Sequence, residues 1–319
     1  MNHYKNENDN NIIKVNGLTK RFGNLTAVNQ ISFTVKKGEI FGFLGPNGAG
    51  KTTTIRMLTG ILSPDSGDAF IAGFSIKKEI IKAKLKIGVI PEISNVYVDL
   101  TAKQNIILSG KFYGIPRREL DKNADDLLRK FDLYERRNEP LKTLSKGLKQ
   151  RVNIACAIVQ APEILFLDEP TSGLDVQSQR IVRNIIKEMH KKGTTIFLTT
   201  HNIEEANMLC ERIGIINKGE IAIIETPEKL RRTFQEAQSV EVSFDGFFDP
   251  SSIENSELIN KMEKIGDKLK LYTCDTDKLV KFLAMFAQNR DLTLVSMEIC
   301  GPSLEDVFVR LTETKEHVD

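Results

Sequence analysis

The sequence has few cysteines and no long apolar run, and both absences exclude classes of protein. No apolar segment approaches the roughly 18 residues of a membrane-spanning helix. The N-terminus from Met1 to Asn11 is polar and rich in asparagine, without the apolar core of a signal peptide. The four cysteines are far apart and lack the spacing of a metal site; they are Cys156, Cys210, Cys274 and Cys300. We therefore expect residues 1–11 to form a disordered tail, Cys156 to be buried in an apolar helix, and the chain to occupy the reducing cytoplasm.

The chain also lacks an excess of charge of one sign. Its 45 Lys and Arg residues are balanced by 43 Asp and Glu residues, and no dense basic cluster stands out. Nucleic-acid-binding proteins usually carry such a cluster, so we expect no nucleic-acid partner. The composition, 40% apolar and 28% charged, is that of a globular protein with a full core, and a length of 319 residues favours two domains.

A glycine-rich segment carries the clearest chemistry. It matches the P-loop pattern G-x-x-x-x-G-K-[ST] and consists of Gly45, Pro46, Asn47, Gly48, Ala49, Gly50, Lys51 and Thr52. An apolar run at residues 40–44 precedes it and a predicted helix over residues 53–62 follows, which is the strand, loop and helix context that the pattern requires. Loop N–H groups and the helix N-terminus attract a phosphate, Lys51 adds a positive charge, and Thr52 offers a hydroxyl to Mg²⁺. The segment therefore predicts a nucleotide-binding site, to which we also assign Thr53.

Strand-like and helix-like segments alternate from about residue 12 to residue 235. This order predicts an α/β domain with a largely parallel sheet. Short unbroken apolar runs at 164–167 and 194–199 are typical of strands covered on both faces. Apolar residues between them recur at helical spacing and predict a helix that ends near Gly193, and residues 217–220 predict a hairpin turn.

The composition changes after residue 232, and we expect a small α+β domain over residues 236–319. Strands are predicted at 240–244, 269–272 and 294–297, with helices at 277–289 and 303–312. This region contains no catalytic constellation.

Further polar motifs follow the P-loop in a fixed order. Asp168 and Glu169 end a buried strand, where one carboxylate can hold Mg²⁺ and the other can polarise an attacking water. The segment PTSGLD over residues 170–175 comes next, and His201 follows the strand that ends near residue 199. The segment LSKGLKQR occupies residues 144–151, ahead of the acidic strand.

Together these motifs resemble the nucleotide-binding domain of ATP-binding cassette (ABC) proteins over residues 12–226. The segment 144–151 is similar to the family signature L-S-G-G-Q, and Phe22 resembles the aromatic residue on which adenine stacks. The resemblance implies a P-loop NTPase fold over residues 12–235, with a parallel sheet core, an antiparallel β subdomain and an α-helical subdomain. It also implies that two such domains pair head to tail, with ATP and Mg²⁺ between the P-loop of one and the signature of the other.

The resemblance implies a role for each remaining motif. Ser145 and Gly147 would bind the γ-phosphate held by the partner domain, and Asp175 belongs to the same interface. Glu169 and His201 would be the catalytic residues. The signature departs from the family pattern at Lys146 and Leu148 but keeps Ser145 and Gly147.

The family's Q-loop has a glutamine at the position that Glu92 occupies. A carboxylate can also bind Mg²⁺ but adds a negative charge. We therefore predict Thr52, Asp168 and Glu92 as the metal shell.

The segment 301–308, GPSLEDVF, is similar to the tail of daunorubicin-resistance-type ABC ATPases, whose partners are ABC-2 export permeases. The resemblance implies the ATPase subunit of an exporter, a homodimer on the inner face of the membrane, with a separate permease received beside residues 95–100. Tyr97 and Val98 in that segment are as well suited to packing in the core as to contact with a permease.

Three other functions remain as alternatives. Soluble ABC ATPases that act on ribosomes or RNA usually carry two cassettes in one chain. ABC ATPases of DNA repair split the cassette with a long coiled coil, for which no heptads are present. A P-loop kinase of small molecules leaves the signature and His201 unexplained.

Overall fold

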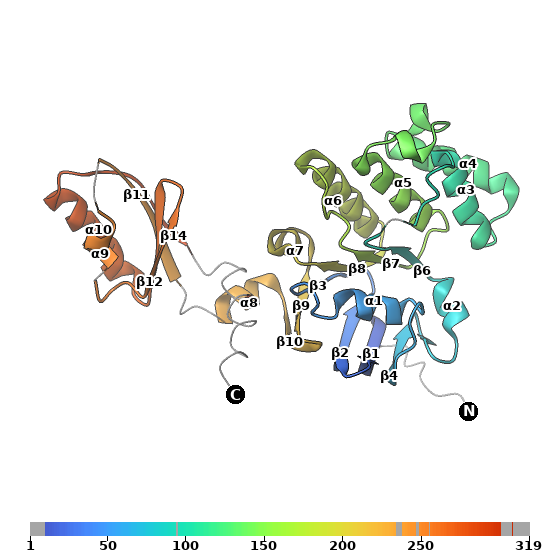
Figure 1. The fold of residues 1–319 in the computed structure, drawn as a ribbon, viewed down its shortest axis with the longest axis horizontal. Coiled ribbons are helices and arrows are strands. Elements are labelled where there is room, and N and C mark those ends of the chain that lie inside the picture. Colours follow the sequence, from blue (N-terminus) through green and yellow to red (C-terminus); the bar gives the residue numbers. More distant parts are fainter. Residues whose placement is uncertain are drawn as a thin grey trace. The chain divides into compact units, whose positions relative to one another are not determined.

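The computed structural model describes residues 10–93, 95–233, 238–246, 249–254, 256–300 and 308. The chain forms two compact units that divide between Ile224 and Glu225 (Figure 1). The predicted domain boundary between residues 235 and 236 lies outside the described residues, as does the predicted helix over residues 303–312 apart from residue 308. Of the predicted tail, residues 1–9 lie outside the described part, and Asn11 is already the first residue of a strand. Within the described ranges, no helix is long and apolar enough to cross a membrane.

A six-stranded sheet forms the centre of the first unit, in the order β10-β9-β3-β8-β7-β6. Its strands are β3 (Ile40–Leu44), β6 (Ile87–Ile90), β7 (Ile164–Asp168), β8 (Thr195–Thr200), β9 (Arg212–Asn217) and β10 (Glu220–Glu225). All neighbours from β9 to β6 pair in parallel. Every residue of β3, β7 and β8 is buried, as the unbroken apolar runs predict. Lys218 and Gly219 join β9 to β10 with φ of 48° and 81°, the geometry of a tight hairpin turn, so that prediction is confirmed.

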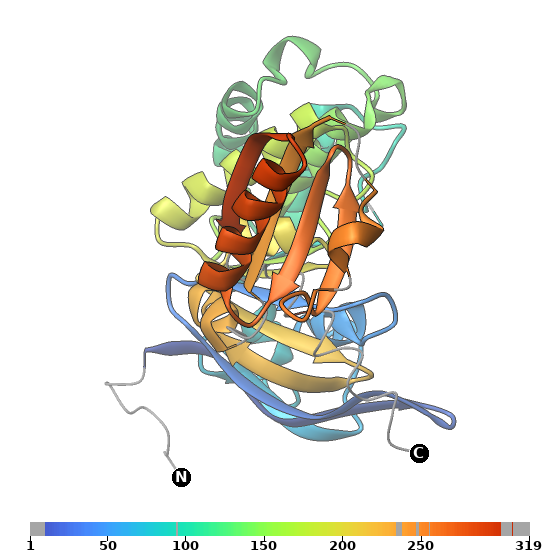
Figure 2. The same cartoon turned by 90° about the vertical axis from the view of Figure 1, so that its left-hand side faces the viewer.

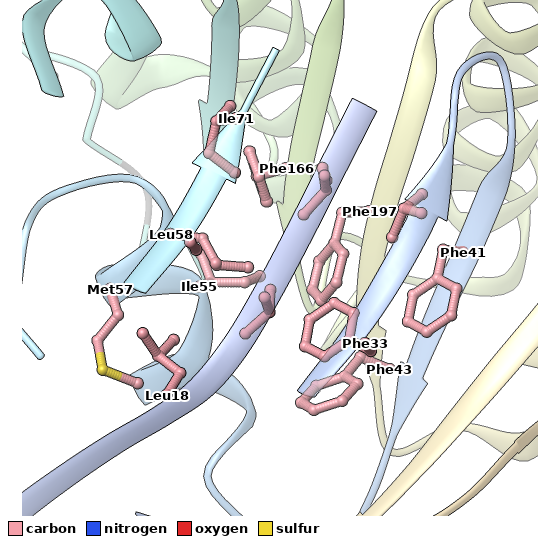
Figure 3. Packing of buried hydrophobic residues seen from close by; sticks show 14 of the residues in the cluster. Leu18, Phe33, Phe41, Phe43, Ile55, Met57, Leu58, Ile71, Phe166 and Phe197 are labelled. Carbon is pink, nitrogen blue, oxygen red and sulfur yellow. The ribbon is translucent and has the colours of Figure 1, made fainter. Parts of the chain in front are cut away.

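A second, antiparallel sheet has the order β2-β1-β4-β5. It consists of β1 (Asn11–Phe22), β2 (Leu25–Lys36), β4 (Ser66–Ile71) and β5 (Phe74–Ser75), and the helix α2 (Ile80–Lys84) follows it. A shared core joins this sheet to the central one and to the helix α1 (Lys51–Leu58), as Figure 3 shows. Phe33 of β2 stacks on Phe41 of β3 with ring centroids 5.6 Å apart, and both contact Phe197 of β8. Ile55 and Leu58 from α1 complete the core, which fixes the helix that follows the P-loop.

Helices occupy the chain between β6 and β7 and gather at one end of the first unit (Figures 1 and 2). They are α3 (Ala102–Phe112), α4 (Arg117–Lys130), the 3₁₀ turns η1 (Tyr134–Arg136) and η2 (Leu141–Thr143), and α5 (Lys146–Ile158). Two more helices flank β8, namely α6 (Val176–Lys191) and α7 (Ile203–Leu209). The helix α6 ends as predicted, with Gly193 at a φ of 89° just beyond it. The parallel core, antiparallel β sheet and helical region confirm the expected fold class.

The second unit opens with α8 (Pro227–Thr233) and continues as a β-α-β-β-α-β chain. Its elements are β11 (Gln238–Asp245), α9 (Ser251–Glu254), β12 (Lys261–Ile265), β13 (Lys268–Thr273), α10 (Thr276–Asn289) and β14 (Thr293–Cys300). The strand order is β12-β13-β11-β14 with antiparallel pairing throughout, which is the ferredoxin-like topology. Residues of α9 and α10 share one apolar cluster with β11 and β13, so both helices cover the same face of the sheet (Figure 2). Three of the four strands and α10 were predicted; β12 and α9 were not.

Candidate nucleotide site

The P-loop joins the carboxyl end of β3 to the start of α1, as predicted. Gly48 and Gly50 have φ of 80° and 105°, a left-handed conformation that favours glycine. A Cβ added to Gly45 would collide with the backbone carbonyl of Ile216, and one on Gly50 would come within 2.5 Å of the carbonyl oxygen of Ala27. The loop therefore needs glycine at these positions to curl tightly at the end of the sheet.

Lys51 is the first residue of α1, and its ammonium lies inside the curl of the loop. Its Nζ donates hydrogen bonds to the carbonyl oxygens of Gly45, at 2.7 Å, and Pro46, at 3.1 Å. It also lies 3.3 Å from Oε1 of Glu169, with both side chains largely buried. A lysine ammonium at a glycine-rich loop that leads into a helix N-terminus is suited to hold a phosphate.

The strand β7 delivers Asp168 beside the start of α1. Its Oδ1 accepts a hydrogen bond from Thr199 Oγ1 at 2.6 Å and another from Thr52 Oγ1 at 3.3 Å. A hydroxyl and a carboxylate this close are oxygen ligands of the kind that Mg²⁺ takes when phosphates and waters complete its shell. In the described part of the chain, no group of three or more His, Cys, Asp and Glu could hold a metal ion. Thr52 and Asp168 thus fit Mg²⁺, while Thr53 follows them on the first turn of α1.

Glu169 links the P-loop to the residue that follows β8. One carboxylate oxygen, Oε1, pairs with Lys51, and the other, Oε2, lies 2.8 Å from Nδ1 of His201. Its backbone N–H donates to the carbonyl of Thr199 at 3.1 Å, and its φ of 50° is left-handed. The structure therefore brings Lys51, Glu169 and His201 together, in an arrangement that can accept a proton from an attacking water.

Two other predicted residues lie at the N-termini of helices. Ser145 caps α5 and accepts a hydrogen bond from the N–H of Leu148 at 3.4 Å. Asp175 caps α6 and accepts hydrogen bonds from the N–H and the Oγ of Ser178 at 2.8 and 2.7 Å. The backbone hydrogen bond from Ser178, followed by the one from its side chain, holds the pKa of Asp175 below its usual range.

Gly147 lies beside these caps, because a Cβ on it would meet the side chain of Ser178. Over the ranges that the structure describes, no hydrogen bond or ion pair links Ser145, Gly147 or Asp175 to Lys51, Thr52 or Asp168. Their polar contacts in the described structure are instead with residues at the N-termini of α5 and α6.

Glu92 and Phe22 lie at the edges of the site. Glu92 is exposed and forms no hydrogen bond or ion pair with another described residue. It follows β6, whose Ile90 pairs in register with Leu167 of β7, so it lies at the same edge of the sheet as Glu169. Phe22 ends β1 with 49% of its surface exposed, and Nζ of Lys20 lies 5.7 Å from the centroid of its ring. The roles of both residues stay predictions.

Thr199 is a residue that the sequence motifs do not reveal. Its hydroxyl holds Asp168, and its backbone carbonyl holds Glu169. The strands β7 and β8 pair in parallel, with Asp168 opposite Thr199. A prediction that these two strands are neighbours would have identified Thr199, but residue spacing along the chain does not show which strands are neighbours.

The sequence of the chain is similar to those of known proteins. The sequence profile of the family described as ABC transporter matches residues 28–172. The chain is 36% identical to the linearmycin resistance ATP-binding protein of Bacillus subtilis (strain 168), over 94% of this chain and 98% of that protein. It is 34% identical to the Nod factor export ATP-binding protein I of Ralstonia nicotianae, over 94% of each chain.

Solved structures of ATP-binding cassettes are also similar to this chain. An ATP-binding subunit of an ABC transporter superposes with a TM-score of 0.64 and 30% identity, over 70% of this chain and 93% of that one. A dimeric ATP-binding cassette bound to ADP and phosphate in a post-hydrolysis state superposes with a TM-score of 0.62 and 28% identity, over 67% and 98%.

Proposed function

The chain belongs to the ABC transporter family of ATPases, and we propose that it is the ATP-hydrolysing subunit of an ABC-2-type export system. In this proposal two copies of the chain bind MgATP between them and drive a separate membrane permease. The observation that carries it is the meeting of Lys51, Glu169 and His201 at the P-loop.

The residues of one chain supply the first half of the reaction. The P-loop amides and Lys51 would bind the β- and γ-phosphates and leave the γ-phosphate at the end of β7. Thr52 and Asp168 would hold Mg²⁺, which neutralises phosphate charge when bound, with Glu92 as a further oxygen donor. Glu169 would take the proton of the attacking water, and His201 would hold the γ-phosphate and the water in line.

A second copy would supply the other half. Ser145 is the N-cap of α5 and Gly147 lies in its first turn, where the N-terminal N–H groups would attract an anion. Asp175 begins α6 beside them. If these N-termini bind the γ-phosphate held by the partner, ATP binding closes the dimer and hydrolysis releases it. The dimeric form of the related cassette supports this arrangement.

The permease would dock on the segment after β6. A cavity of about 350 Å³ lies there, lined by residues of that segment, α3 and α5 that include Tyr97, Asn105, Phe112 and Asn153. Tyr97 and Phe112 are 55% and 73% exposed, which suits an apolar partner segment. The names of the relatives, which refer to linearmycin resistance and to Nod factor export, support an export role, and docking would hold the chain on the inner face of the membrane.

Co-purification tests this proposal with a matched pair of variants. Glu169→Gln should retain ATP and hold the closed dimer on its permease, whereas Glu163→Gln makes the same chemical change at an exposed surface pair with Lys86. Each tagged variant would be recovered from membranes in mild detergent with MgATP, and its partners identified by mass spectrometry.

We expect a polytopic membrane protein at near-stoichiometric amount with Glu169→Gln. It should be lost when Phe112→Lys is added. Ribosomal proteins or nucleic acid without a membrane partner would contradict the export function and favour a soluble ABC ATPase.

A further inference from the structure

We infer that the buried Glu205 is a positioning residue for hydrolysis, because it anchors the turn that carries Glu169. The contact runs through Thr171, two residues after Glu169. This inference rests on the catalytic role proposed for Glu169 and adds to it a side chain that the motifs do not include.

The turn after β7 needs external support. Glu169 has a φ of 50°, a left-handed conformation that a side chain with a Cβ adopts only when its surroundings impose it. The turn is closed by the N–H of Ser172, which donates to the carbonyl of Glu169 at 3.1 Å. The backbone of the turn is also held by the N–H of Glu169, which donates to the carbonyl of Thr199 at 3.1 Å, and by the N–H of Leu174, which donates to the carbonyl of Thr171 at 3.2 Å. The position of the Glu169 carboxylate depends on how firmly this turn is held.

Three side chains from neighbouring helices supply that support. Gln179 of α6 donates from Nε2 to the carbonyl of Thr171 at 3.5 Å. Gln150 of α5 donates from Nε2 to the carbonyl of Pro170 at 2.8 Å. Thr171, which is buried, donates from Oγ1 to Oε1 of Glu205 at 2.7 Å. Consecutive residues after Glu169 are thus held from two sides.

The surroundings of Glu205 favour a functional role over a purely structural one. Glu205 is 0% exposed, and its other neighbour is Arg183, whose Nε lies 3.6 Å from the same Oε1. Its second oxygen, Oε2, has no hydrogen-bond partner among the residues that the structure describes. A buried carboxylate with a free oxygen is expensive, and apolar side chains in place of Glu205 and its polar partners together would stabilise the fold at least as well.

Glu205 also connects the two catalytic residues. It lies in the first turn of α7, and its N–H donates to Oδ1 of Asn202 at 2.9 Å, the residue directly after His201. His201 contacts Glu169, and Glu205 holds the turn behind Glu169. The buried carboxylate of Glu205 therefore holds the turn that carries Glu169 against α7, the helix that follows His201.

Thr171→Val tests the contact because it removes the hydroxyl and keeps the volume. We expect kcat to fall about tenfold to a hundredfold, as for a catalytic group misplaced by a fraction of an ångström to an ångström. KM and Kd for MgATP should stay at the wild-type values, because the P-loop is unchanged. Thr171→Ser, which keeps the donor, should restore kcat, and Glu205→Gln, which keeps an acceptor oxygen, should retain it within about threefold.

Thr59→Val is the matched control. Thr59 is equally buried and donates its hydroxyl to the carbonyl of Ile55 at 2.8 Å, outside the site. A kcat for Thr171→Val equal to that of Thr59→Val would overturn the inference, as would equal losses in Thr171→Val and Thr171→Ser. If Thr171→Val fails to fold, the kcat of Glu205→Met can be compared with that of Glu205→Gln instead.

Glu169→Gln separates this inference from the proposed function. Full hydrolysis by Glu169→Gln would remove the catalytic role of Glu169 itself. Loss of hydrolysis in Glu169→Gln together with a wild-type kcat in Thr171→Val would leave that role standing and remove only the positioning by Glu205.

Discussion

At the scale of single residues, Glu169 lies between the ammonium of Lys51 and the imidazole of His201. A carboxylate in this position can accept a proton, whereas the amide of glutamine cannot. We expect Glu169→Gln to lower the rate of ATP hydrolysis by about 10² to 10⁴ while MgATP binding persists. Phosphate release and equilibrium nucleotide binding measure the two effects. A hydrolysis rate within a few-fold of that of the Glu163→Gln control would rule out a proton-accepting role.

Glu92 carries a second prediction at this scale. It stands at the edge of the sheet that holds Asp168 and Glu169, and a carboxylate there strengthens the attraction for a cation. Glu92→Gln should therefore raise the Mg²⁺ concentration needed for half-maximal ATPase activity. A magnesium titration at fixed ATP measures this. Unchanged Mg²⁺ dependence and an unchanged rate would show that Glu92 is only a surface acid.

The cysteines differ in reactivity because they differ in burial. Burial raises the pKa of the Cys156 thiol to about 12, and burial also raises that of Cys210. The thiolate is the reactive form, so at pH 8 neither thiol should react with a disulfide reagent in the folded protein. Cys274 is exposed and should react promptly. A thiol titration before and after unfolding measures this, and rapid labelling of Cys156 in the folded state would contradict the structure.

At the scale of elements, the capping box of α3 lies beside the cavity assigned to the permease. Thr101 Oγ1 accepts from the N–H of Gln104 at 3.2 Å, and Gln104 Oε1 accepts from the N–H of Thr101 at 2.9 Å. Thr101→Ala removes the first of these bonds and should lower the free energy of unfolding by about 1 kcal/mol. Denaturant unfolding measures this, and Thr101→Ser should preserve the wild-type value. Equal stability of the alanine and serine variants would show that the cap does not stabilise α3.

Elements with a strong local pattern could be predicted from the sequence, and those set by neighbours could not. The run Ile40–Leu44 is unbroken and apolar, and it is β3 to the residue. The helix after the P-loop runs from Lys51 to Leu58 rather than over residues 53–62, with Gly50 as its N-cap. The strand β12 (Lys261–Ile265) is mostly polar and is stabilised by its pairing with β13, so its own residues carry little signal.

The same distinction applies to the site. Lys51, Thr52, Asp168 and Glu169 belong to contiguous motifs, and the structure brings them together as predicted. Thr199 and Glu205 act through contacts between residues more than 30 positions apart, at 2.6 Å to Asp168 and 2.7 Å to Thr171. Only the folded sheet and the packing of α7 create those contacts.

At the scale of the whole molecule, the chain combines an ATPase unit with a ferredoxin-like unit. The second unit has its own apolar cluster of β11, β13, α9 and α10 residues. The match to the linearmycin resistance protein covers 94% of this chain, so it extends into the second unit, whereas the superposition on the solved ATP-binding subunit covers 70% of it. The alternation of strands and helices in the sequence predicts the fold class of the first unit. The strand order of the second unit is known only from the strand pairing in the structure.

We propose that MgATP binds between two copies of the chain, and the mass in solution of the Glu169→Gln protein tests this. Light scattering or sedimentation measures the mass with MgATP and with MgADP. We expect a dimer with two bound ATP molecules in MgATP and a monomer in MgADP, because only the γ-phosphate would join the P-loop of one copy to the α5 N-terminus of the other. A protein that binds ATP and stays monomeric at every concentration would contradict the shared site.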